Sequence, residues 1–126
     1  MAKKIIDTDV IIEFLRGDSS LYNDIVGQLI SVITVSEIYY GEIYLHGLQE
    51  GKIRLNELIN HLDLEVIDID FDVALKFTEL KRELEKNGLK IEDMDLLIAS
   101  TAIVSNVEFL TNNKKHFTRI KQLKLV

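Results

Sequence analysis

The chain has 126 residues with a formal net charge of −6 and contains no cysteine, which suits one domain and excludes a disulfide framework, a zinc–thiolate site and a cysteine nucleophile. The negative charge argues against a protein that coats nucleic acid unselectively, because contacts to phosphate need Lys and Arg. No apolar run approaches the length that crosses a bilayer, and residues 1–4 leave no room for a signal peptide, so we expect a soluble cytoplasmic protein.

The chain opens with a short apolar run, Lys4-Ile5-Ile6, that stops at two carboxylates one residue apart, Asp7 and Asp9. A second apolar run with helical spacing follows over residues 10–16 and ends at Gly17, so the pattern predicts a strand, an acidic turn and a helix. Asp9 is a candidate N-cap of that helix. Asp7 is harder to explain structurally, because a carboxylate at the end of a buried strand is costly unless something compensates its charge.

The next predicted elements are a weak helix over residues 18–28 and a strand over residues 29–34. Thr34 and Glu37 have the spacing of a capping box at the start of a helix over residues 36–46. Glu37 also follows an apolar strand directly, as the first acidic pair does. The helix over residues 36–46 is apolar around most of its circumference, so it must be covered on more than one side, and we expect a second subunit or a partner protein to supply the second cover.

The second half of the chain continues the alternation of helix and strand. A helix over residues 49–62 and a strand over 64–69 precede a long helix, which Asp70 caps and which stops at Asn87. The sequence offers capping as a sufficient role for Asp70.

A second acidic cluster, Glu92-Asp93-Met94-Asp95, stands at the start of a buried helix. Asp93 is a natural N-cap, and Asp95 lies in the first turn, where the helix dipole favours an acid by only ~0.3–1 kcal/mol. A charge at the edge of a core usually has a partner. Because no Lys or Arg lies close to Asp95 in the sequence, this position favours a metal ion.

The end of the chain predicts a strand over residues 107–111, the amides Asn112 and Asn113, a short helix or turn over 114–119 and a closing edge strand over 123–126. Alternating strands and helices predict an α/β fold with three α/β/α layers around a mainly parallel sheet of four to five strands. The last fifteen residues contain no acid and five basic residues: Lys114, Lys115, Arg119, Lys121 and Lys124. A basic edge beside an acidic pocket suits a metal-dependent enzyme that acts on a polyanion, and a solvated tail is the alternative.

Seven polar side chains share a position at a strand end or a helix start: Asp7, Asp9, Glu37, Asp93, Asp95, Asn112 and Asn113. Oxygen ligands without a thiolate suit a hard cation, Mg²⁺ or Mn²⁺. Carboxylates held close together without a metal would repel one another, and one of them would take up a proton. With one or two divalent ions they could orient a water and stabilise the charge that builds on a phosphodiester.

Four segments, in this order and spacing, resemble the motifs of PIN-domain ribonucleases and above all the VapC toxins of toxin–antitoxin pairs: Asp7-Thr8-Asp9, Thr34-Val35-Ser36-Glu37, Asp95-Leu96-Leu97-Ile98-Ala99 and Leu110-Thr111-Asn112-Asn113. The resemblance covers essentially the whole chain and implies a single PIN-like domain over residues 1–126. It implies an endoribonuclease that depends on Mg²⁺ or Mn²⁺ and hydrolyses RNA phosphodiesters with a metal-activated water. It also implies a homodimer, for which we expect the Tyr-rich helix over residues 36–46, and a VapB-like antitoxin that inserts a segment into the acidic groove.

The same resemblance assigns roles by position. Asp7, Glu37 and Asp95 match the three core acids, and Asn113 falls where many family members carry a fourth acid. This Asn removes one negative charge and leaves one or two metal ions as open alternatives. Asp9 is a further candidate ligand that could also orient Asp7. The additional candidates for the site are Asp93, as ligand or cap, and Asn112, Thr8 and Thr111. The candidates for holding flanking RNA phosphates are Lys114, Lys115 and Arg119.

Two other classes of protein share parts of this pattern. The Asp7-x-Asp9 spacing also resembles haloacid-dehalogenase-type phosphatases, in which the first Asp is a nucleophile, but Asp93-x-Asp95 is a poor substitute for their downstream acidic pair. A receiver-like signalling module would hold a phosphoacceptor Asp in a Mg²⁺ pocket. Here the strand after the second helix lacks a lone terminal Asp, and no strand-end Lys follows.

Overall fold

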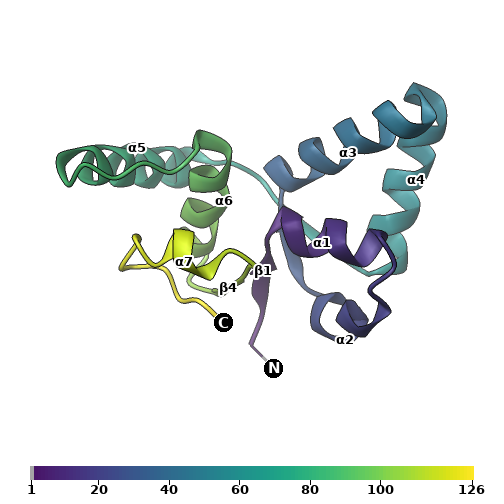
Figure 1. The fold of residues 1–126 in the computed structure, drawn as a ribbon, viewed down its shortest axis with the longest axis horizontal. Helices are drawn as coiled ribbons and strands as arrows, with labels where there is room; N and C mark the ends of the chain where they lie inside the picture. Colours follow the sequence, from purple (N-terminus) through teal and green to yellow (C-terminus); the bar gives the residue numbers. More distant parts are fainter. Residues whose placement is uncertain (1) are drawn as a thin grey trace.

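The computed structural model describes residues 2–126, which fold around a four-stranded parallel sheet (Figure 1). The strands are β1 (Lys4–Ile6), β2 (Leu29–Ser31), β3 (Glu65–Ile67) and β4 (Glu108–Leu110), in the order β3-β2-β1-β4. The chain moves outward from β1 through β2 to β3 and then returns to the other side of β1 as β4. Such a switch point at the carboxyl ends of parallel strands is where α/β sheets leave a crevice for ligands.

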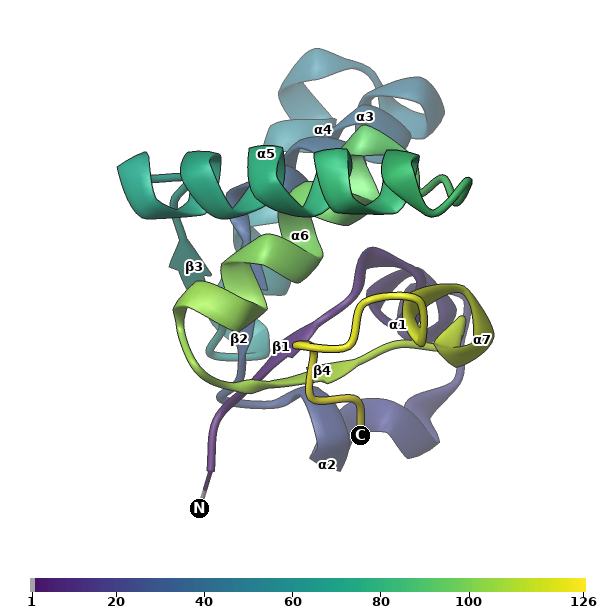
Figure 2. The same cartoon turned by 90° about the vertical axis from the view of Figure 1, so that its left-hand side faces the viewer.

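Residues 2–126 also form seven α-helices and one 3₁₀ helix: α1 (Thr8–Leu15), η1 (Ser19–Leu21), α2 (Tyr22–Ile25), α3 (Val32–His46), α4 (Leu48–His61), α5 (Phe71–Lys86), α6 (Asp93–Val104) and α7 (Lys114–Phe117). Figure 1 shows α1 to α4 on one side of β1 and α5 to α7 on the other. In the perpendicular view of Figure 2, α5 lies across α6. The predicted three-layer α/β/α fold is therefore confirmed.

The two central strands, β1 and β2, are buried on both faces because helices cover both sides of the sheet. Ile5 and Leu29 belong to the core cluster that contains α5, α6 and the C-terminal segment, whereas Ile6 and Ile30 belong to the cluster under α1 to α4. Consecutive strand residues point to opposite faces, so β1 and β2 each supply both cores. Ile5, Ile6 and Ile30 have no exposed surface.

The start of α3 corrects one prediction. The helix begins at Val32, directly after β2, and Ser31 is its N-cap, with a side chain that accepts a hydrogen bond from the Ile33 amide at 3.0 Å. Thr34 is therefore buried inside the helix, and the predicted capping box with Glu37 is wrong. Ser31 takes the role because β2 ends three residues earlier than its apolar pattern indicated.

Helix α1 also begins earlier in the sequence than predicted. Asp7 is the N-cap, and its Oδ1 accepts a hydrogen bond from the Thr8 amide at 2.9 Å, so Asp9 lies in the first turn and is not the cap. In α6 the N-cap is Glu92, and Asp93 is the first helical residue, so its predicted capping role is wrong. The cap predicted for α5 is confirmed, because Asp70 Oδ1 accepts from the Val73 amide at 2.9 Å.

Two weaker elements are shorter than expected. The helix predicted over residues 18–28 is divided into η1 and α2. The edge strand predicted over residues 123–126 is reduced to one parallel bridge between Leu125 and Phe109. None of the helices in the described part of the chain is both long and apolar enough to cross a membrane.

Candidate active site

An open cavity of about 310 Å³ lies where β1 and β4 end. It is lined by eight residues: Asp7, Thr8, Asp9, Ile12, Glu37, Asp95, Asn113 and Phe117. They come from the β1–α1 junction, from α3, from the first turn of α6 and from the segment after β4. Because parallel strands end at the same edge of the sheet, residues separated by more than a hundred positions meet here. The fold thus brings together side chains from all four acidic or amide-bearing segments of the sequence.

Asp7 is only 4% exposed, and donors hold both of its carboxylate oxygens. Oδ1 accepts from the Thr8 amide at 2.9 Å, and Oδ2 accepts from Thr111 Oγ1 at 2.8 Å. Burial raises the pKa of Asp7 to about 7, repulsion by Asp9 and Asp95 adds to the increase, and the two hydrogen bonds oppose it. Asp7 is therefore a carboxyl group that is costly to ionise unless a cation offsets its charge.

Asp95, in the first turn of α6, also has a raised pKa. Burial raises its pKa, and Asp9 and Glu92 raise it further, while His116 lowers it. The His116 Nε2 atom lies 3.9 Å from Asp95 Oδ2, and its ring stands edge-on to Phe117 at 5.2 Å between centroids. His116, on α7, therefore faces the acidic cluster.

Glu37 is held by a hydroxyl group of another element. Thr8 Oγ1 donates to Glu37 Oε1 at 2.7 Å and lies 2.9 Å from Thr34 Oγ1. Thr8 is 7% exposed and Thr34 is fully buried, whereas Glu37 is half-buried at the cavity. Hydrogen bonds in such a buried position are geometrically well defined, because water does not compete for the donors.

The segment after β4 forms the rim of the cavity. The Asn113 amide donates to Thr111 Oγ1 at 3.0 Å, which turns the chain so that the exposed Asn113 reaches the cavity. The Asn112 amide is 3.5 Å from Asp9 Oδ1, but the Asn112 side chain donates to the carboxylate of Glu13. Asn112 thus contacts the site through its backbone and does not line the cavity with its side chain.

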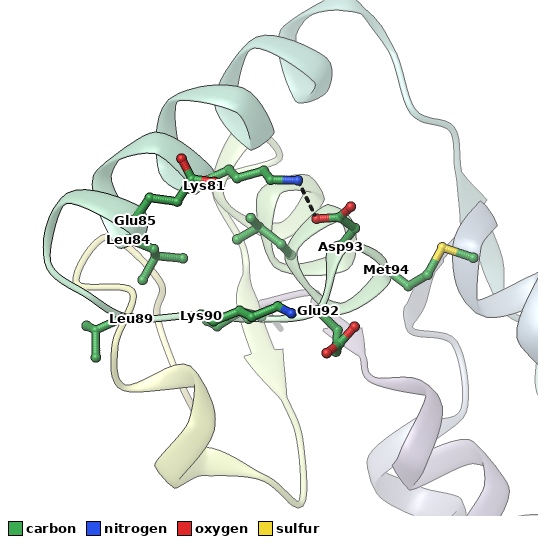
Figure 3. A pocket seen from close by; sticks show the side chains of 10 residues that line it. Lys81, Leu84, Glu85, Leu89, Lys90, Glu92, Asp93 and Met94 are labelled. Carbon is green, nitrogen blue, oxygen red and sulfur yellow. Dashed lines mark hydrogen bonds and ion pairs between the residues drawn. The ribbon is translucent and has the colours of Figure 1, made fainter.

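The structure does not bring two of the other sequence candidates to this cavity. Asp93 Oδ1 accepts from Lys81 Nζ at 3.0 Å across a separate cavity of about 580 Å³ between α5 and α6 (Figure 3). Arg119 Nη1 donates to the Lys90 carbonyl at 2.7 Å and lines a third cavity. Asp93 is thus occupied by an ion pair and Arg119 by a backbone acceptor.

The remaining basic candidates and two unpredicted residues lie close by. Lys114 and Lys115 are exposed on α7, immediately after Asn113. Ile12 and Phe117, which were not predicted as site residues, form the apolar part of the cavity wall. Each lies four residues after a site residue, Thr8 or Asn113, so helical spacing from those residues could have indicated them.

The donor set fits a hard cation. Within residues 2–126, no three His, Cys, Asp or Glu side chains are already grouped closely enough to enclose a metal ion. The cavity nevertheless presents carboxylate, hydroxyl and amide oxygens and no sulfur, which are the donors that Mg²⁺ and Mn²⁺ prefer. Burial raises the pKa of Asp7 and Asp95, and repulsion between the carboxylates adds to it; a divalent cation would offset both effects.

A family model and individual protein sequences both match this chain, and they indicate the same family. A model of the PIN domain matches residues 4–123. Ribonuclease VapC1 of Methanocaldococcus jannaschii is 33% identical over 126 residues, which cover 98% of this chain and 85% of that protein. Ribonuclease VapC2 of Rickettsia felis is 38% identical over 94 residues, which cover 75% of this chain and 69% of that protein.

Solved structures agree with this result. The structure of VapBC2 from Rickettsia felis bound to a promoter DNA fragment superposes with a TM-score of 0.77 at 30% identity, covering 98% of this chain and 96% of the other. DNA-bound VapBC from Salmonella typhimurium gives a TM-score of 0.86 at 25% identity, covering 100% and 98%. These matches confirm the resemblance seen in the motifs and do not favour the phosphatase or receiver alternatives. The chain belongs to the PIN-domain family, and the relatives that it matches there are VapC ribonucleases.

Proposed function

We propose that this protein is the endoribonuclease toxin of a VapBC-type toxin–antitoxin pair and that it hydrolyses RNA phosphodiesters at the acidic cavity with Mg²⁺ or Mn²⁺. The observation that carries the proposal is the meeting of Asp7, Asp9 and Asp95, in which burial and like charges raise the pKa of Asp7 to about 7. Packing alone gives no reason to gather repelling carboxylates, whereas cation binding does.

In this proposal Asp7, Glu37 and Asp95 hold the cation, and Asp9 and Asn113 are supporting donors at the mouth of the cavity. The hydrogen bonds from Thr111 and from the Thr8 amide fix both oxygens of Asp7, so its orientation is set before a ligand enters. A divalent cation bound here would supply the positive charge that acidifies a water and offsets charge on the phosphodiester. Asn113 supplies no charge, so the number of cations, one or two, depends on the remaining acids.

The RNA backbone would approach across α7. Lys114 and Lys115 are exposed beside the cavity, where they can contact phosphates on either side of the cleaved bond. In this proposal Arg119 does not contact the RNA backbone, because its guanidinium donates to the Lys90 carbonyl and lines a different cavity.

The proposal includes protein partners. The VapBC titles of the matched structures support a VapB-like antitoxin. The exposed apolar side of α3 supports a homodimer, because Tyr40, Tyr44 and Leu45 are 74%, 81% and 70% exposed. Sedimentation of the isolated chain tests the dimer, and a monomer at micromolar concentration would exclude it.

The function is tested by cleavage of a labelled single-stranded RNA with Mg²⁺ or Mn²⁺. Wild-type protein is expected to cut the RNA, and a chelator to stop it. Asp7→Asn and Asp95→Asn are each expected to lower the rate at least about 100-fold, because each removes a charged ligand. Asp72→Asn, an exposed acid at the start of α5, is the matched control and is expected to cut normally. Wild-type rates in both site variants would exclude the assignment.

A further inference from the structure

Thr34 has a buried hydroxyl group with an unusual partner. The side chain is fully buried, and Oγ1 lies 2.9 Å from Thr8 Oγ1 of another helix. By contrast, the equally buried Thr101 of α6 donates its hydroxyl to a carbonyl of its own helix, Leu97 O, at 2.8 Å. Thr34 does not cap α3 either, because Ser31 does. Its hydroxyl therefore serves a contact between α3 and α1.

Thr8 connects this contact to two carboxylates of the cavity. Its backbone amide donates to Asp7 Oδ1 at 2.9 Å, and its hydroxyl donates to Glu37 Oε1 at 2.7 Å. An ionised Glu37 carboxylate can only accept, and the Thr8 hydroxyl has a single hydrogen to share between its two oxygen neighbours. That hydrogen therefore goes to Glu37, and Thr8 accepts from the Thr34 hydroxyl. Thr34 and Glu37 are three residues apart on α3 and share a face of the helix.

We propose that Thr34 is a positioning residue, which orients the Thr8 hydroxyl and thereby holds the Glu37 carboxylate at the cation cavity. This inference rests on the proposed function and deepens it. A free Glu side chain has several rotamers, and fixing one of them before a cation arrives removes an entropic cost from binding. The hydrogen bond engages Oε1 and leaves the second carboxylate oxygen for the cation.

The test is Mn²⁺ binding to the purified protein by calorimetry, with the metal dependence of RNA cleavage measured in parallel. Thr34→Val keeps the shape of the side chain and is expected to raise the Kd for Mn²⁺ about tenfold, with an equal shift in the half-saturating Mn²⁺ concentration. Thr34→Ser restores the hydroxyl and is expected to stay within about twofold of wild type. Thr101→Val removes an equally buried hydroxyl that does not line the cavity and donates within its own helix, so it is the matched control, with an unchanged Kd.

A second measurement separates positioning from a general structural effect. In a Glu37→Gln background, Thr34→Val is expected to cause no further loss of Mn²⁺ affinity, because the carboxylate that it positions is gone. An equal loss in both backgrounds overturns the proposal, as does a Thr34→Val protein that binds Mn²⁺ like Thr101→Val. If thermal melting shows that Thr34→Val does not fold, Thr34→Ala is measured against the same expectations.

The outcome also distinguishes this inference from the proposed function. A wild-type protein that neither binds Mn²⁺ nor cleaves RNA overturns both. A wild-type protein that does both, with a Thr34→Val variant that is indistinguishable from it, overturns only the positioning role of Thr34.

Discussion

Asp7 couples the proposed chemistry to the stability of the protein. Its pKa is about 7 in the folded protein, against an ordinary value of 3.8, chiefly because it is buried. Between these two pKa values the folded protein keeps a proton on Asp7 that the unfolded chain releases. This contribution to stability is therefore complete below about pH 4 and is lost as the pH rises through 7. The difference between the two pKa values corresponds to roughly 4 kcal/mol.

Asp7→Asn is accordingly expected to stabilise the metal-free protein at pH 8, by about 1–4 kcal/mol, although it lowers the cleavage rate at least about 100-fold. The gain should shrink towards pH 5, where the wild-type carboxyl is already protonated. Urea unfolding in the presence of a chelator measures both values. Asp72→Asn is the control, and an Asp7→Asn effect that is the same at both pH values would contradict the assignment of the raised pKa.

Asp93 and Asp95 are two residues apart but have different surroundings. Asp93 forms an exposed ion pair with Lys81, whereas Asp95 lines the acidic cavity. Asp93→Asn is therefore expected to change the cleavage rate by less than about twofold and stability by under ~1 kcal/mol, the usual limit for an exposed ion pair. Cleavage assays and urea unfolding of Asp93→Asn beside Asp95→Asn measure this contrast. Equal loss of activity in the two variants would place Asp93 among the cation ligands after all.

In the helical hairpin of α3 and α4, the backbones of the two helices approach each other closely at Gly51. A Cβ atom on Gly51 of α4 would lie 3.0 Å from the Ile43 amide nitrogen and 3.1 Å from the Glu42 carbonyl carbon of α3. Backbone atoms cannot rotate away as a side chain would, so the helices would have to separate. Nearby, the Glu42 carboxylate accepts from Arg54 Nε at 2.9 Å and joins the same two helices.

Gly51→Ala is therefore expected to destabilise the protein by about 1–3 kcal/mol, although alanine favours helices intrinsically. Gly41 provides the matched control, because a Cβ there meets nothing within 4 Å. Gly41→Ala should stabilise the protein by roughly 0.5–1 kcal/mol. Denaturant unfolding of both variants tests the comparison, and a stabilised Gly51→Ala would show that the hairpin can open without cost.

At the scale of the whole molecule, the charges are separated although their sum is −6. Acids gather at the cavity, and the exposed Lys114 and Lys115 follow directly on its rim. Lys114 and Lys115 can attract a polyanion locally, although the net negative charge of the protein would repel it. RNA affinity and cation affinity should therefore depend on different residues.

The double variant Lys114→Gln/Lys115→Gln is expected to weaken RNA binding and to reduce the salt dependence of log K by about 1.4, which is roughly 0.7 for each lost contact to a single strand. Binding of Mn²⁺ should stay unchanged. Titrations of a non-cleaved RNA analogue at several salt concentrations measure the slope. Lys52→Gln/Lys86→Gln, two exposed lysines on α4 and α5, is the control; a similar loss there would point to non-specific attraction.

The sequence by itself determined the features that depend on neighbours along the chain. Helix and strand periodicity predicted the α/β alternation, and a single capping residue, Asp70, predicted the start of α5. The acids at the strand ends followed from the same local pattern, since a parallel sheet places such ends at one edge. Local pattern failed where two residues could cap the same helix: Ser31 and Thr34 are three positions apart, and only the length of β2 decides between them.

Only the tertiary structure decided which polar groups face one another. The ion pair of Asp93 with Lys81 depends on how α5 lies against α6, and the link from Thr34 through Thr8 to Glu37 depends on how α1 meets α3. Such contacts join residues 12 to 29 positions apart, and no periodicity within one helix encodes them. The sequence could therefore indicate the acids of the site, whereas the groups that orient them were fixed by the packing of separate helices around β1.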